Sequence, residues 1–237
     1  MLQIYPDQEA LSQAAAGLFV RRVEESIRAR GQCRVVLSGG ATPRRTYELL
    51  AKPPLRDRVT WSRIHVFWGD ERCVPPDDPR SNAAMAREAL LKRVPIPQAQ
   101  IHPMLCGPSP EAAALAYEKT LRSHFVGRPP RFDLIFLGLG VDGHTASLFP
   151  GEARLLEGER WVAAVHPPGR DLPRITLTPV IINQARVVAF LVAGADKAAI
   201  LKKTLQGPGE PRRLPAQLIK PLTGEIYWLV DQSAADF

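Results

Sequence analysis

The chain has 237 residues, of which 45% are hydrophobic and 23% are charged, and its formal net charge is +7. This hydrophobic content is ordinary for a globular protein and ample for a core. No apolar run approaches the length of a membrane span, and the N-terminus lacks the apolar segment of a signal peptide. We therefore expect a cytoplasmic protein without a membrane partner, folded as one domain over residues 1–237.

The positive charge suits a protein that binds anions. The basic residues are scattered and do not alternate with aromatic residues, which argues against a nucleic-acid partner. A basic balance also suits an enzyme that attracts phosphorylated substrates. The three cysteines, Cys33, Cys73 and Cys106, are odd in number and widely spaced, so they indicate neither a disulfide framework nor a zinc site.

The first predicted elements form a helix–strand–helix unit. Apolar residues recur at helical spacing over 7–30, and Gly31 ends that helix. A short apolar strand at 33–37 leads into Ser-Gly-Gly-Ala-Thr-Pro at 38–43, where Thr42 is the expected N-cap of a helix reaching about residue 50. The glycines and the helix dipole can hold an anion, although a tight turn is an equally good interpretation of this stretch alone.

Charged residues follow the next buried strand, predicted at 64–68. Asp70, Glu71 and Arg72 lie at its end, and such groups are costly there unless they are paired or used. We expect Asp70 and Glu71 to be mainly structural and Arg72 to face a substrate. A local ion pair that closes the loop is the alternative.

Two helices are predicted next, of which only the second, over 111–125, carries no obvious chemistry. The first covers 77–91, with Ser81 and Asn82 in its first turn. His65 lies inside a predicted strand and His124 near the end of a helix. We interpret His65 as a packed residue and His124 as a surface residue, and neither as a metal ligand.

The stretch 132–151 organises the chain. An apolar run predicts a buried parallel strand, and Gly138, Gly140 and Gly143 then allow a sharp turn. The turn delivers Asp142 and His144 just past the carboxyl end of the strand, where open α/β sheets bind ligands. We expect a short helix after it, stopped by Pro150-Gly151.

The glycine spacing of this stretch also matches the dinucleotide-binding fingerprint, which is weak evidence alone. That fingerprint requires a long following helix and an acidic residue at the end of the next strand, and both are missing. We therefore favour a catalytic loop that presents a histidine and a carboxylate. The plain alternative is a capped turn with an ordinary loop histidine.

The last third of the chain supplies further cations. A strand at 161–165 and a rigid loop carrying Arg170 precede an alternating segment, 174–178, which places Arg174 on one face with two threonines. An arginine among hydroxyls is a plausible anion clamp. After a buried strand at 187–192, Lys197 lies in the first turn of a helix. There its charge opposes the helix dipole, so Asp196 or a bound phosphate must offset it.

The sequence Gly-Leu-Gly-Val-Asp-Gly-His-Thr-Ala-Ser-Leu-Phe-Pro-Gly at 138–151 resembles the signature of the glucosamine-6-phosphate isomerase/6-phosphogluconolactonase family. Its continuation after Asp-Gly-His is similar to that of the lactonases rather than the deaminases. Residues 38–43 are similar to the family element that contacts the sugar phosphate. The deaminases have their base at the position of Asp70, followed by Glu-Tyr, whereas this chain has Arg72, as the lactonases do.

The resemblance implies an open, mostly parallel, Rossmann-like α/β sheet with helices on both faces. It also implies hydrolysis of 6-phospho-D-glucono-1,5-lactone by a monomer that uses neither metal nor cofactor. His144 would be the general base, Asp142 its orienting partner, and Arg72 or Arg170 would stabilise the carbonyl oxygen. The residues expected to bind the substrate and its phosphate are Ser38, Gly39, Gly40, Thr42, Asp70, Arg170, Arg174 and Lys197.

Two other functions stay open at this point. One is a glucosamine-6-phosphate deaminase or isomerase with Asp70 as its base. The other is a sugar-phosphate-binding protein without enzymatic activity.

Overall fold

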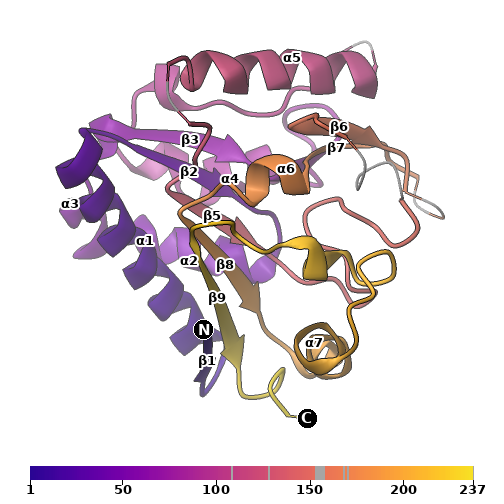
Figure 1. Cartoon of the computed structure of the whole chain (residues 1–237). Coiled ribbons are helices and arrows are strands. Elements are labelled where there is room, and N and C mark those ends of the chain that lie inside the picture. Colours follow the sequence, from indigo (N-terminus) through magenta and orange to yellow (C-terminus); the bar gives the residue numbers. More distant parts are fainter. Residues whose placement is uncertain (108, 128, 153–157, 168, 170, 237) are drawn as a thin grey trace.

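Six parallel strands form the central sheet of the computed structural model, which describes residues 1–107, 109–127, 129–152, 158–167, 169 and 171–236 (Figure 1). In spatial order the strands are β1 (Leu2–Tyr5), β9 (Glu225–Asp231), β8 (Val187–Val192), β5 (Leu134–Leu137), β2 (Cys33–Leu37) and β3 (Ile64–Trp68).

The inner strands β2, β5 and β8 are mainly apolar. Every residue of β2, β5 and β8 is buried, which is the pattern of a parallel sheet covered on both faces. The predicted α/β class and parallel sheet are confirmed, and the predicted bounds of β2, β3 and β8 match those observed. β1 was not predicted, because its four residues are largely exposed and show no apolar periodicity.

A second, antiparallel sheet of three strands lies beside the first and consists of β4 (Asp70–Arg72), β7 (Arg174–Leu177) and β6 (Val162–Val165). Asp70 pairs with Thr176, and Arg72 pairs with Arg174. This register brings two segments that are far apart in the sequence to the carboxyl end of β3, together with their charged side chains.

Helices pack around both sheets, with α1 and α3 on one side and α5 running across β6 and β7 (Figure 1). The α-helices are α1 (Gln8–Arg30), α2 (Ala41–Leu50), α3 (Leu55–Arg58), α4 (Asn82–Ala89), α5 (Pro110–His124), α6 (Pro179–Ile182) and α7 (Ala198–Gln206). Short 3₁₀ turns cover Trp61–Arg63, Leu91–Arg93, Gln98–Gln100, Ala195–Lys197 and Pro215–Leu218. None of the helices among the described residues is long and apolar enough to cross a bilayer.

Three predictions about helices were wrong. The N-cap of α2 is Gly40, at φ 108°, and not Thr42. α4 begins at Asn82 rather than at 77, since 77–81 form a turn that Ser81 ends by capping the helix. No helix forms over 144–152, which the structure describes in full. The chain instead folds back, with the Gly140 N–H donating to the His144 carbonyl and Ala146 at φ 49°.

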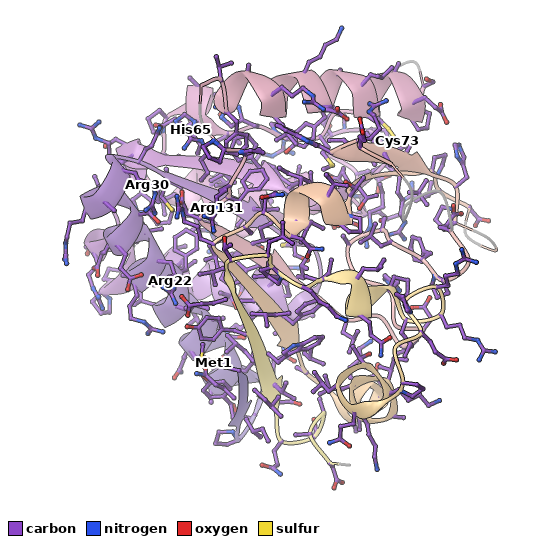
Figure 2. All side chains as sticks on the ribbon, viewed as in Figure 1. Met1, Arg22, Arg30, His65, Cys73 and Arg131 are labelled. Carbon is purple, nitrogen blue, oxygen red and sulfur yellow. A yellow bond between two sulfur atoms is a disulfide. The ribbon has the colours of Figure 1, made fainter. Side chains whose placement is uncertain are left out.

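Cys73 and Cys106 form a disulfide. The spacing of the three cysteines did not indicate one, so that expectation was wrong. Cys73 follows β4 and Cys106 precedes α5, and their Cα atoms lie 5.2 Å apart although the sequence separation is 33 residues. Figure 2 shows Cys73 near one end of α5. Cys33 is a buried free thiol, whose pKa burial raises well above its ordinary value.

The strand order reverses between β2 and β5. From β2 the chain crosses to β3 on one side, whereas β5, β8 and β9 follow on the other side. At such a reversal the connections leave the carboxyl ends of neighbouring strands in opposite directions, which opens a crevice for ligands. The loops that follow β2, β5 and β8 therefore meet at one place.

Candidate active site

A cavity with a volume of about 480 Å³ lies at this crevice, within the size range of small-molecule sites. Its wall includes the loops after β2, β5 and β8 and the charged ends of β4 and β7. Of the residues predicted for the site, it is lined by Ser38, Gly39, Gly40, Thr42, Asp70, Arg72, His144, Arg174 and Lys197. Arg170 lies outside the described residues.

The loop after β2 is held by a buried tyrosine. The Ser38 N–H donates to the Tyr47 hydroxyl (2.9 Å), which in turn donates to the Ser38 carbonyl (3.0 Å). This clamp fixes the backbone where it leaves the sheet, before Gly40 turns it into α2 with a positive φ. Because no side chain caps α2, its first N–H groups face the cavity region as anion donors.

Gly39 is required by a close approach. A Cβ atom on this residue would lie 1.9 Å from Oδ1 of Asn82, the first residue of α4. The Asn82 amide in turn donates to the Asp70 carbonyl (2.9 Å) and to the Asp70 carboxylate (3.1 Å). The glycine loop, α4 and β4 are thus locked together through one buried amide.

Asp70 is almost fully buried, with 6% of its surface exposed. Its carboxylate accepts a hydrogen bond from the Ser147 hydroxyl (2.6 Å) and lies 3.8 Å from the Arg174 guanidinium. The side chain thus holds Arg174 on the cavity wall and is itself anchored by the buried Ser147. This engagement fits the structural role predicted for Asp70.

Glu71 organises the start of α4. Its carboxylate accepts from the backbone N–H groups of Arg72, Asn82 and Ala83 (each 2.8 Å) and from the Ser81 hydroxyl (2.9 Å). Burial raises the pKa of Glu71 above its ordinary value, and these hydrogen bonds oppose that shift. The residue is structural, as predicted, and it places Asn82 against the glycine loop.

His144 and Asp142 form the central pair. The imidazole Nδ1 is in hydrogen-bond contact with Oδ1 of Asp142, which also accepts from the His144 backbone N–H (3.1 Å). Burial raises the pKa of Asp142, but the hydrogen bonds that the carboxylate accepts and the electrostatic attraction of His144 together outweigh this effect, so the net shift is downward. An ionised carboxylate on Nδ1 selects the tautomer in which Nδ1 is the donor and Nε2 the acceptor.

Steric room for this pair depends on Gly140. A Cβ atom there would lie 2.0 Å from Nδ1 of His144 and 2.8 Å from Oδ1 of Asp142. The ring also packs against Phe149, with 4.6 Å between the centroids, and the Arg174 guanidinium lies 5.4 Å from the centre of the same phenyl ring. Phe149 thus contacts both the imidazole and the guanidinium.

Three cations line the cavity from different elements. Arg72 donates to the Arg80 carbonyl (2.5 Å), Arg174 faces Asp70, and Lys197 lies 3.2 Å from the Asp196 carboxylate. Asp196 is thus close enough to offset the charge of Lys197, as one of the two sequence-based explanations required. Lys197 also lines the cavity, where a phosphate could bind. The clamp proposed for 174–178 loses its hydroxyls, because Thr176 and Thr178 are buried and donate to the Leu177 and Arg160 carbonyls.

Sequence reasoning did not single out Ser147 as part of the site, although it lies inside the 138–151 signature. Its role depends on a hydrogen bond to a residue 77 positions earlier. The only signal available was its place in the motif.

Comparisons with known proteins identify the family and agree with the fold. The family model described as glucosamine-6-phosphate isomerases/6-phosphogluconolactonase matches residues 6–228. A 6-phosphogluconolactonase from Synechocystis sp. is 45% identical over 234 residues, covering 97% of this chain and 95% of the relative. The structure of 6-phosphogluconolactonase from Trypanosoma brucei superposes with a TM-score of 0.85 at 33% identity, covering 100% of this chain and 97% of the other. That of the Thermotoga maritima protein gives 0.83 at 31% identity, covering 98% and 99%.

Proposed function

This chain belongs to the glucosamine-6-phosphate isomerase/6-phosphogluconolactonase family, and we propose that it hydrolyses 6-phospho-D-glucono-1,5-lactone to 6-phospho-D-gluconate. It is an enzyme of the 6-phosphogluconolactonase class, EC 3.1.1.31, in the pentose phosphate pathway. The observation that carries the mechanism is one cavity that joins the His144–Asp142 pair to a glycine loop and three cations.

The phosphate of the substrate is held at the cationic end of the cavity. Backbone N–H groups after Gly40 and the dipole of α2 favour an anion. Arg174 offers a guanidinium fork and Lys197 a point charge. Ser38, Gly39 and Thr42 complete this wall, and Asp70 keeps Arg174 in position. Fixing the phosphate lowers the entropic cost of bringing the lactone carbonyl to His144.

His144 acts as the general base. With Nδ1 donating to Asp142, Nε2 accepts a proton from a water molecule as the water oxygen attacks the lactone carbonyl carbon. The tetrahedral intermediate then collapses with cleavage of the bond between that carbon and the ring oxygen. The same imidazole returns the proton to the departing ring oxygen, and the carboxylic acid product ionises. Asp142 orients the ring and stabilises the imidazolium.

Negative charge develops on the carbonyl oxygen during the attack and requires a donor. Arg72 lines the cavity, and its contact with the Arg80 carbonyl fixes its guanidinium. A fixed positive charge next to this oxygen stabilises the transition state most strongly in a site that excludes water. Arg170 is the second residue proposed for this role.

The activity is tested with freshly prepared 6-phosphogluconolactone in a pH-stat, or in an assay coupled to oxidation of the product. Because the lactone also opens spontaneously, each rate is corrected with an enzyme-free blank. We expect acid release well above the blank and saturation with substrate. A rate equal to the blank would contradict the proposal.

The deaminase alternative requires Asp70 as a mobile base. Its carboxylate is instead engaged by Asn82, Ser147 and the nearby Arg174, which favours the lactonase. Incubation with glucosamine 6-phosphate should therefore release no ammonia above background. Rapid ammonia release would overturn the choice, and sugar-phosphate binding without any turnover would favour the non-enzymatic alternative. The monomeric state, the cytoplasmic location and the absence of a cofactor stay predictions.

Lys197→Ala is expected to weaken substrate binding more than catalysis. Loss of one charge-assisted contact to the phosphate should raise KM roughly 10- to 100-fold, with a smaller change in kcat. The matched control is Lys202→Ala, because Lys202 is an exposed lysine on α7 that does not line the cavity. Steady-state kinetics on the lactone measure both variants. An unchanged KM for Lys197→Ala would remove this residue from the phosphate site.

A further inference from the structure

Three histidines gather at the end of the sheet opposite to the candidate active site. His65 is the second residue of β3, His102 lies between Gln98–Gln100 and α5, and His124 is the last residue of α5. One nitrogen from each lies within 4.8 Å of the others. The rings of His65 and His102 stack, so His65 is packed, as predicted. His124 is half-buried rather than a surface residue, and the cluster makes both residues candidate metal ligands, which was not predicted.

The spacing of the rings is that of a nitrogen ligand set. His65 Nδ1 and His102 Nε2 are 3.2 Å apart. Zinc–imidazole bonds are about 2.0–2.1 Å long, so two nitrogens on a tetrahedral zinc ion lie about 3.3 Å apart. The ring centroids are separated by 5.5 Å for His65 and His102, 5.2 Å for His65 and His124, and 4.3 Å for His102 and His124. Small side-chain rotations would bring the third nitrogen to the same point.

The backbone positions of these residues are fixed independently of any ligand. The His102 N–H donates to the Val66 carbonyl of β3 (2.9 Å), and its carbonyl accepts from the Tyr117 hydroxyl of α5 (3.0 Å). Phe67 stacks on the His102 ring at 4.7 Å and meets the His124 ring edge to face. Because these contacts already fix the residues, binding of an ion would require little further ordering of its ligands.

The electrostatics suit a cation that accepts neutral nitrogen ligands. Burial lowers the pKa values of His65 and His102 to about 4, and His124 is shifted in the same direction. The imidazoles are then neutral near pH 7, the form that coordinates metals. His124 ends α5, where the helix dipole favours positive charge. Arg34 opposes a cation, which limits the affinity.

The cluster is accessible. All three histidines are half-buried, and His65 forms part of the wall of a surface cavity of about 360 Å³ that also includes Gly31, Ser62 and Gln100. Figure 2 shows His65 near the end of α5 that is opposite to Cys73. Three protein nitrogens and a solvent-facing side leave a fourth position for water.

We propose that His65, His102 and His124 form a binding site for one Zn²⁺ ion, separate from the lactonase site. The ion would cross-link β3, the segment that contains His102, and the end of α5. Its effect would be on stability, since the active site lies at the carboxyl ends of the strands and His65 near the amino end of β3.

The test uses the full chain without a histidine tag, stripped with a chelator and dialysed. Zinc binding is measured by titration against a chromophoric chelator and by elemental analysis after gel filtration. Thermal unfolding is recorded with and without zinc. We expect one zinc ion per chain and a higher Tm in its presence, while Co²⁺ should give the visible absorption bands of a tetrahedral site.

The variants separate this site from other histidines. His124→Asn, at a half-buried helix end, is expected to fold, to lose at least tenfold in zinc affinity and to lose the zinc-dependent rise in Tm. His144→Ala and His166→Ala are expected to retain both. Failure of the wild-type chain to bind zinc, or equal binding by His124→Asn, would show that the cluster is only a packed group of imidazoles. Loss of binding in His144→Ala would move the metal to the active site.

Discussion

Replacing His144 with alanine is expected to lower kcat by about 10²- to 10⁴-fold, the range that a positioned general base contributes. The imidazole lines the cavity and is oriented by Asp142, so its removal leaves water without a proton acceptor. The phosphate-binding residues are untouched, and 6-phosphogluconate should therefore bind with nearly unchanged affinity. Stopped-flow or pH-stat kinetics and calorimetric titration of the product measure the two effects separately.

The control is His166→Ala. His166 is an exposed histidine, 3.9 Å from Glu111, and it does not line the cavity. This variant should keep the wild-type kcat, which excludes a general effect of losing a histidine. Full turnover by His144→Ala would remove the residue from the mechanism, whereas loss of product binding would point to a role in holding the substrate.

Gly140→Ala is expected to reduce kcat by about 10²-fold or more without unfolding the chain. The added methyl group would overlap the His144 ring, at 2.0 Å from Nδ1. A side-chain ring can rotate away, so the fold survives, but the ring then leaves Asp142 and its productive orientation. A displacement of about 1 Å in a catalytic group can cost 10²-fold in rate.

Gly138→Ala is the matched control in the same loop. A Cβ atom on Gly138 meets no other atom within 4 Å, and neither glycine has a positive φ. Both variants reduce the conformational freedom of the unfolded backbone by the same amount. They differ in that only Gly140→Ala would produce a clash with the imidazole. Circular dichroism and Tm should be similar for both, and only Gly140→Ala should lose kcat. Equal kinetics would mean that His144 does not depend on this space.

Local pattern was enough to predict the most buried strands. β2, β3 and β8 are short, mainly apolar runs, with Arg34 in β2 and His65 in β3 as the exceptions, and a parallel sheet covered on both faces buries such runs. The same logic placed Asp142, His144 and the glycine loop at one edge of the sheet, because carboxyl ends of parallel strands lie together.

What the sequence missed depends on contacts between distant segments. α4 begins at Asn82 because the Glu71 carboxylate accepts the N–H groups of Asn82 and Ala83, and no local signal predicts that partner. The Cys73–Cys106 bridge and the three histidines depend on how the segment 95–107 passes β3, which it contacts through Ile101 and His102. Spacing along the chain carries no information about such neighbours.

The pairing of β1 with β9 sets the order in which this protein can mature. Leu2 lies opposite Trp228 and Tyr5 opposite Asp231, and the Met1 amine donates to the Ile226 carbonyl (2.7 Å). A nascent chain therefore cannot form this pair until the ribosome has released nearly all the rest. Because β1 pairs with no strand other than β9 among the described residues, this edge of the sheet is the last that can form during synthesis.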